Sequence, residues 1–246
     1  MKRIGRFWNW RTVLGGLLVA GAVMTTAQAG WFRLGGTSWK EEVRLQDDST
    51  IVVTRLIYLH SRHEMGQKPG VSEERIIFTL PGTNHRATWV SEYSKEIGRS
   101  NLKPIALHIQ SGTPYIVTVP NLCLAYNKWG RPNPPYVIFK YDGKAWQRIP
   151  LSKLPPELKE INLSIVTTDY DAERARRQPL VTTEMVKKLN NGLGIWHPEY
   201  QIILREPLPA GSYGSLVNCE ELVYYKGCWV GPGDSIGKRM ADRMSK

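Results

Sequence analysis

The sequence contains few cysteines, and none of them lies in a pattern typical of a metal site. The three cysteines form no CxxC pair, and no HxxxH pair accompanies them, which argues against zinc. No cysteine lies near residue 29, which argues against a lipoprotein linkage, and the first residues lack the paired arginines of a twin-arginine signal. From these absences we expect neither a metal nor another cofactor.

The first 29 residues have the pattern of an export signal. Four basic residues lie among the first eleven, and an apolar stretch without charge follows from Val13 to Val23. Ala27 and Ala29 are small residues at the two positions that a signal peptidase recognises. We therefore expect cleavage after Ala29 and a periplasmic mature chain, with one β-rich domain over residues 30–233 and a basic tail over residues 234–246.

Retention of the signal as a membrane anchor is the alternative. The uncharged run from Thr12 to Phe32 is close to the roughly 20 residues that a membrane helix needs. The basic end would stay in the cytoplasm in either case, so the body of the chain is exported under both hypotheses. We expect contact with the membrane only through an uncleaved signal.

The chain is basic, which restricts its partners. The formal net charge of +11 falls to about +7 on removal of residues 1–29, because that segment holds four basic and no acidic residues. Outside the cytoplasm a basic surface meets acidic glycans, anionic lipids and other envelope proteins, whereas nucleic acid is not expected there. We predict a cell-envelope glycan or an envelope protein as the partner. The basic residues are scattered along the sequence, so a solvated basic surface is the alternative.

The three cysteines predict one disulfide and one unpaired thiol, as is usual for an odd number in an exported chain. Cys219 and Cys228 flank a segment typical of a strand and a turn, which would bring their sulfur atoms together. We therefore predict the disulfide Cys219–Cys228. Cys123 lies between Leu122 and Leu124 and is expected to be a buried thiol. The alternative is that Cys123 pairs with a second chain in an assembly.

Pairs of strands separated by turn residues dominate the sequence after residue 37. Asp142-Gly143 gives the strongest signal, because Asp-Gly between β-forming residues favours the primed turns of hairpins. The four predicted pairs are Ser38–Leu45 with Ile51–His60, Glu74–Leu80 with His85–Val90, Lys103–Gln110 with Tyr115–Val119, and Tyr136–Tyr141 with Lys144–Ile149. The predicted fold class is mainly β, an antiparallel hairpin meander that forms a sandwich or a barrel-like structure.

The C-terminal third changes character and predicts one or two short helices. The segment Asp169–Arg177 is highly charged and is typical of a solvated turn or a short helix. Thr182 or Thr183 would cap a two-turn helix that runs to Leu189 and stops at Gly192. Two further strands are predicted at Tyr200–Leu204 and Val217–Tyr225. The basic tail is expected to be a short helix or a frayed end, and we favour the frayed end.

The connection from Pro120 to Tyr136 is the most distinctive segment. It contains four prolines and alternates aromatic residues with amide and cationic ones. A flat apolar ring beside polar donors suits sugar rings and acidic polymers, and long loops on a β-scaffold commonly carry binding surfaces. The predicted ligand-binding residues are Tyr126, Asn127, Lys128, Trp129, Arg131 and Tyr136. The alternative is that the aromatic residues fold back as a lid over the core.

A cell-envelope hydrolase is the alternative function, and it depends on two clusters. His60, His63 and Glu64 have metal-ligand side chains, but the preceding strand pattern places residues three apart on opposite faces. Asp169 and Asp171 would bring two carboxylates close for glycoside hydrolysis, although an aspartate that caps the following helix explains them as well. The sequence favours a non-catalytic binding protein.

Four short stretches are distinctive enough to suggest a family. They are Trp39-Lys40-Glu41-Glu42-Val43, Phe78-Thr79-Leu80-Pro81-Gly82-Thr83, Asn127-Lys128-Trp129-Gly130-Arg131-Pro132 and Phe139-Lys140-Tyr141-Asp142-Gly143. Together they resemble a group of uncharacterised exported proteins of Gram-negative bacteria, over about residues 38–165. The resemblance implies export, and it transfers no activity, ligand or site residue.

Overall fold

The structure is a computed structural model that describes residues 36–59, 71–166, 169–194 and 197–245. The chain divides into two units, Met1–Phe32 and Arg33–Lys246, and every described residue belongs to the second. The predicted signal peptide and its cleavage site lie outside the described residues. Within those residues, no helix combines the length and the apolar character that crossing a bilayer requires.

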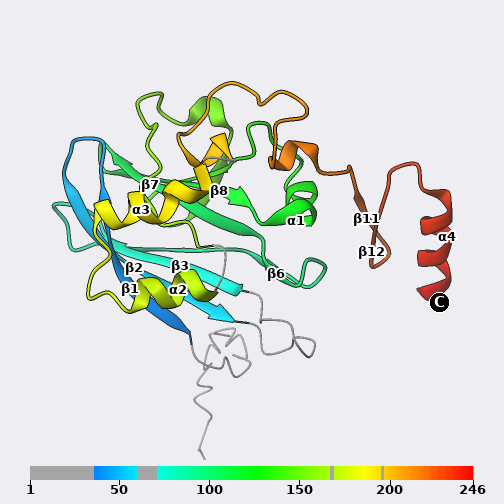
Figure 1. The fold of residues 1–246 in the computed structure, drawn as a ribbon, viewed down its shortest axis with the longest axis horizontal. Coiled ribbons are helices and arrows are strands. Elements are labelled where there is room, and N and C mark those ends of the chain that lie inside the picture. The colour runs from blue at the N-terminus through cyan, green and yellow to red at the C-terminus, as the bar shows by residue number, and fades with distance from the viewer. Residues whose placement is uncertain (1–35, 60–70, 167–168, 195–196, 246) are drawn as a thin grey trace, which may run out of the picture. The chain divides into compact units, whose positions relative to one another are not determined.

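Two four-stranded antiparallel sheets form the body of the fold (Figure 1). The first has the order β1-β2-β3-β4 and the second the order β10-β9-β8-β7. Their strands are β1 (Thr37–Arg44), β2 (Thr50–Leu59), β3 (Val71–Thr79), β4 (Arg86–Val90), β7 (Leu102–Gln110), β8 (Thr113–Pro120), β9 (Val137–Tyr141) and β10 (Trp146–Ile149). All four predicted hairpins are confirmed, and so is the mainly β meander. The described ranges contain no closed barrel.

The Asp142-Gly143 turn forms for the expected chemical reason. The Asp142 carboxylate accepts hydrogen bonds from the backbone N–H groups of Lys144 and Ala145, both at 2.8 Å. Gly143 has a φ of 96°, a left-handed conformation that glycine adopts without steric cost. The turn therefore fixes the register in which β9 pairs with β10.

The burial pattern shows that the two sheets have different surroundings. Along β1 and β2 buried residues alternate with more exposed ones, whereas β8 is buried along almost its whole length. One core lies between the sheets and includes Val53, Ile76 and Leu107. A second core covers the other face of the second sheet and includes Val117 and Ile203. The second sheet is therefore enclosed on both faces.

The helices and the short strands lie after residue 120, apart from one small pair of strands. The helices are α1 (Leu122–Lys128), α2 (Asp169–Arg176), α3 (Thr183–Gly194) and α4 (Ser235–Met244), with 3-10 turns η1 (Leu151–Lys153), η2 (Pro198–Tyr200) and η3 (Leu216–Asn218). The short hairpins are β5 (Tyr93–Ser94) with β6 (Arg99–Ser100), and β11 (Val223–Tyr225) with β12 (Cys228–Val230). The predicted helices near Asp169 and Thr183 are confirmed, but α3 does not stop at Gly192 as predicted and continues to Gly194. The tail forms the helix α4 rather than the frayed end that we favoured.

One predicted strand, Tyr200–Leu204, is wrong. The proline at position 198 begins the 3-10 turn η2, and Ile202 makes only an isolated bridge to Glu160. The Tyr136 hydroxyl provides the other backbone contacts, since it donates to the carbonyl of Ile202 and accepts from the N–H of Leu204. A buried side chain thus replaces the neighbouring strand.

The second predicted strand, Val217–Tyr225, is correct only at its end. The first residues of the predicted strand form the turn η3 instead. The Asn218 side chain accepts a hydrogen bond from the Gly211 N–H and donates one to the Ser212 carbonyl. Only β11 remains as a strand. Local side-chain hydrogen bonds have replaced a sheet ladder here.

The predicted disulfide Cys219–Cys228 is also wrong, because Cys219 is bonded to Cys123, with the two Cα atoms 5.4 Å apart. The hairpin β11-β12 turns so tightly that Tyr225 is paired with Cys228, which keeps Cys219 away from it. Cys228 is the free cysteine, and Cys123 is not the buried thiol that we expected. The bond links α1 to the segment before β11, across 96 residues of sequence.

A buried charged cluster separates the core between the sheets from a third core under α2 and α3. Arg55 on β2 is fully buried and forms ion pairs with Glu41 on β1 and Glu74 on β3. The Glu41 carboxylate also accepts hydrogen bonds from Trp39 Nε1, at 2.8 Å, and from both the backbone N–H and the hydroxyl of Ser164. These contacts connect three strands to the chain that leads into α2.

Candidate functional site

The aromatic residues of the predicted binding loop are largely inside the protein. Tyr126 and Tyr136 are buried, and Trp129 is partly buried and packs edge-on against Phe139. The one proton of the Tyr136 hydroxyl is shared between the carbonyls of Glu199, at 3.0 Å, and Ile202, at 3.1 Å, and burial raises the pKa of Tyr136. The structure therefore gives these three rings no common exposed face on which a sugar ring would stack.

The cationic residues of the same loop are bonded to the protein. Lys128 forms ion pairs with Glu92 and Glu96, the latter at 3.0 Å. Arg131 donates to the backbone carbonyls of Cys219, at 2.7 Å, and Glu220, at 3.0 Å. Its guanidinium also lies 5.1 Å from the centre of the Tyr126 ring.

Asn127 completes this set and shows what the loop does. Its amide nitrogen donates to the Glu220 carbonyl at 2.9 Å, and its amide oxygen accepts from the Leu222 N–H at 2.8 Å. With Arg131 and the disulfide at Cys123, Asn127 fixes residues 219–222 against α1. The geometry matches a lid and clamp, the alternative interpretation of the loop, more closely than an open recognition surface.

The residues of the hydrolase hypothesis are only partly described. His60, His63 and Glu64 lie outside the described residues, as does the side chain of Asp169. Asp171 lines a cavity, which is considered next. Among the described residues there is no group of three or more His, Cys, Asp or Glu side chains that would hold a metal ion.

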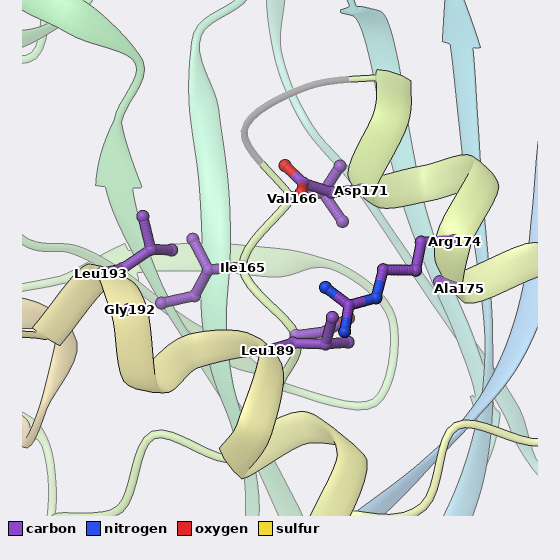
Figure 2. A pocket seen from close by; sticks show the side chains of 9 residues that line it. Ile165, Val166, Asp171, Arg174, Ala175, Leu189, Gly192 and Leu193 are labelled. Carbon is purple, nitrogen blue, oxygen red and sulfur yellow. The ribbon is translucent and has the colours of Figure 1, made fainter.

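A cavity of about 170 Å³ lies between α2 and α3, beside the chain segment 164–166 (Figure 2). Val166, Ala175 and Leu189 form its apolar part, and Asp171 and Arg174 are its charged residues. A neighbouring hollow of about 180 Å³ shares Arg174, Ala175 and Leu189 with the cavity, so the two adjoin. Whole small-molecule ligands commonly occupy roughly 300–1,000 Å³, so a cavity of this size suits a single small group of a larger molecule.

Arg174 distinguishes this cavity from the loop. Figure 2 shows its side chain extending from α2 toward Leu189 on α3. Among the described residues the Arg174 guanidinium makes no hydrogen bond and no ion pair, whereas Arg176 on the same helix is paired with Glu173 at 2.8 Å. A guanidinium offers several N–H donors in a fixed plane that match a carboxylate, sulfate or phosphate group.

The cavity rests on the buried charged cluster. Ser164, one of its lining residues, donates its backbone N–H to Glu41 at 2.7 Å and accepts from Arg55 at 3.3 Å through its carbonyl. Burial raises the pKa of Glu74 at the far side of the cluster, and the positive charge of Arg55 opposes this rise only in part. The bonds to Ser164 fix this wall of the cavity in place.

Sequence reasoning passed over one formal match to the GxSxG pattern of serine hydrolases, Gly233-Asp234-Ser235-Ile236-Gly237. It spans the start of α4, whose first residue is Ser235, and Ser235 does not have the positive φ of a strained nucleophile turn. The Asp234 side chain caps α4, and a Cβ at Gly237 would lie 3.1 Å from Val230 Cγ1. The pattern is therefore explained by helix capping and close packing.

The sequence signal that would have indicated the cavity is the highly charged segment Asp169–Arg177, which we interpreted only as a solvated turn or a short helix. The cavity also needs α3 and residues 164–166, and the spacing of these segments in the sequence does not show that they lie beside α2. Comparison of the chain with models of known protein families, with curated proteins and with solved structures found no match. The resemblance to exported proteins therefore stays a prediction.

Proposed function

We propose that this chain is a non-catalytic, exported binding protein of the cell envelope, and that it binds an acidic glycan through the cavity between α2 and α3. The observation that carries the proposal is the Arg174 guanidinium, which lines a cavity of the size of one anionic group and has no protein partner among the described residues. An anionic polysaccharide carries such a group on each repeating unit.

The charges at the cavity are of both signs, because Asp171 lines it together with Arg174, and the cations nearby are what favour an anionic ligand. Lys188 lies at the adjoining hollow, and Arg177 follows the end of α2. Residues 30–246 have a formal charge of about +7, so long-range attraction also favours a polyanion over a neutral polymer. The apolar wall at Val166 and Leu189 would contact the carbon ring that bears the acidic group.

The binding loop does not carry this proposal, because its cations already have protein acceptors. We therefore propose that the α2–α3 cavity binds the ligand and that the loop has a structural role, which is to hold residues 219–222 against α1. The expected partner class, a cell-envelope glycan, is unchanged from the sequence prediction, while the residues that would bind it are different.

The test compares two arginines on one helix. We would measure binding of a polyuronate to residues 30–246 by calorimetry, with neutral dextran as the control polymer. Arg174→Ala should weaken binding by roughly tenfold, the factor expected for loss of charge-assisted hydrogen bonds. Arg176→Ala removes the same positive charge, but the Arg176 guanidinium is already paired with Glu173. This variant should therefore change the affinity less than about twofold.

The two variants also define what would contradict the proposal. Equal weakening by Arg174→Ala and Arg176→Ala would mean that only net charge matters and that the cavity is not the site. If the unmodified protein did not bind polyuronate, the proposal of an acidic glycan as the ligand would be wrong. An envelope protein would then be the remaining partner class.

Export is tested separately from binding. Sequencing of the N-terminus of the protein recovered from a periplasmic fraction should give Gly30 as the first residue. Recovery of the chain with Met1 in the cytosolic fraction would contradict the proposed location.

A further inference from the structure

The C-terminal helix α4 is firmly attached to the hairpin β11-β12. The Asp234 carboxylate caps the helix by accepting from the N–H groups of Ile236, at 3.1 Å, and Gly237, at 2.8 Å. Ala241 is buried, and Asp242 accepts hydrogen bonds from the Tyr225 hydroxyl and the Lys226 ammonium group of the hairpin. One face of α4 is therefore fixed inward, which determines the face that points outward.

The outward face carries a row of apolar side chains in water. Ile236, Met240 and Met244 are 63%, 58% and 76% exposed. Residues four apart lie on the same side of a helix, so these three side chains form one stripe along α4. Exposure of one large apolar residue is ordinary, but a row of three on one short helix requires an explanation.

Two arginines of α4 lie beside this stripe, and the acidic residues of α4 and its cap lie elsewhere on the helix. At 3.6 residues per turn, Arg239 and Arg243 project on the same side as Ile236 and Met240. Both are exposed. The carboxylates of α4 and its cap, Asp242 and Asp234, are used in the attachment described above. The outward face is therefore both apolar and cationic.

This combination fits an anionic lipid surface better than a protein. A helix of 10 residues is about 15 Å long, so its outward face is much smaller than the roughly 800 Å² per partner of a standard protein interface. The row is also convex, with no groove for a partner's side chain. A bilayer surface, in contrast, accepts a short apolar row into its interfacial region and supplies phosphates for flanking arginines.

We propose that the outward face of α4 binds the surface of a membrane that contains anionic phospholipids. Ile236, Met240 and Met244 insert among the headgroups, and Arg239 and Arg243 contact phosphates. This binding is peripheral, and it is separate from the cavity between α2 and α3. It would hold the exported body at the surface of a membrane whether or not the signal segment is cleaved.

The experiment is co-sedimentation of residues 30–246, which contain the complete second unit and exclude the predicted signal, with lipid vesicles. Vesicles of phosphatidylcholine alone are compared with vesicles that also contain phosphatidylglycerol. The unmodified protein should bind the anionic vesicles and show little binding to the neutral ones. The double variant Arg239→Gln/Arg243→Gln should bind about twenty-five-fold more weakly, since each basic residue contributes roughly a fivefold factor at an anionic surface.

A second double variant tests the apolar stripe. Met240→Ser/Met244→Ser should weaken binding to anionic vesicles while it leaves the midpoint of thermal unfolding unchanged, because both side chains are exposed. Arg86→Gln, which removes an exposed basic residue of β4, is the control for loss of positive charge elsewhere, and it should leave vesicle binding within about twofold of the unmodified protein.

Three results would overturn the proposal. One is equal binding of the unmodified protein and both double variants, and another is no binding to anionic vesicles. The third is sedimentation of the unmodified protein as a dimer that Met240→Ser/Met244→Ser dissociates, because the stripe would then be covered by a second copy of the chain.

Discussion

The loop from Pro120 to Tyr136 and the layer formed by α2 and α3 both carry basic residues, but they use these charges differently. In the loop, Arg131 donates to the backbone carbonyls of Cys219 and Glu220. On α2, Arg174 lines a cavity and has no such acceptor among the described residues. Composition therefore does not distinguish a binding surface from a structural clamp. The two regions differ in that the Arg131 guanidinium is bonded to the protein, whereas Arg174 is an exposed side chain that lines a cavity without such a bond among the described residues.

The largest expected effect concerns the charged cluster beneath the cavity. Arg55→Leu leaves Glu41 and Glu74 buried without their cation, which should lower the free energy of unfolding by about 3–5 kcal/mol. The measurement is urea unfolding at neutral pH. Arg44→Leu is the matched control, because Arg44 is also paired on a strand, to Asp48, but in solvent, so its midpoint should hardly change. Similar midpoints for the two variants would show that the cluster does not support the cavity.

The disulfide that closes the clamp should have the next largest effect. Cys123→Ser removes a bond to Cys219 that closes a long loop, and loss of such a bond typically costs about 2–5 kcal/mol. The free energy of unfolding should fall by this amount, and the segment after residue 205 should become more susceptible to limited proteolysis. Cys228→Ser is the control, because Cys228 is unpaired. The assignment fails if Cys228→Ser is the more damaging change.

The comparison is sharpened by a change that separates structure from recognition. Arg131→Ala removes two charge-assisted hydrogen bonds to carbonyls and should cost about 1–2 kcal/mol, because both carbonyls are only partly shielded from water. Polyuronate affinity at a temperature where the variant is folded should remain unchanged. If Arg131→Ala lowered the polyuronate affinity without lowering the stability, the loop and not the cavity would be the binding site.

The hairpins were predictable from the sequence because their causes are local. Turn residues such as Asp142-Gly143, together with the β-forming residues beside them, act within about ten residues of sequence, and all four predicted pairs are present. The helices near Asp169 and Thr183 were predictable for the same reason, since caps and charge patterns are short-range signals.

The clamp and the cavity could not be predicted because their contacts join distant residues. Cys219 bonds to Cys123 rather than to the nearer Cys228, because the tight turn of β11-β12 pairs Tyr225 with Cys228. Arg174 faces α3 only because both helices pack on the core that includes Trp39. These arrangements follow from tertiary packing, which no spacing in the sequence records.

The protonation of Glu74 gives a smaller and pH-dependent effect. Burial raises the pKa of Glu74 above its ordinary value of 4.5, so the folded protein favours the protonated carboxyl. The resulting stabilisation is complete below about pH 4.5 and is lost as the pH rises through the raised pKa. Glu74→Gln has no such proton. The stability of the unmodified protein relative to Glu74→Gln should therefore decrease as the pH rises, by no more than about 1.4 kcal/mol per pH unit.

Urea unfolding of both proteins between pH 4 and pH 8 measures this difference, and the other carboxyl groups cancel because the two proteins share them. Parallel stability curves would mean that burial does not raise the pKa of Glu74 in the folded protein.

The smallest effect is expected at the exposed edge of the loop. Lys128→Met removes the ion pairs with Glu92 and Glu96, whose side chains are partly in water, so it should cost only about 0.5 kcal/mol. The difference from the unmodified protein should shrink further in 1 M salt, because salt screens exposed pairs. Arg131→Ala in the same urea experiment should keep most of its larger cost in salt, since its acceptors are carbonyl groups and not charges. If Lys128→Met cost as much as Arg131→Ala and resisted salt, the clamp would depend on its ion pairs rather than on its bonds to residues 219–222.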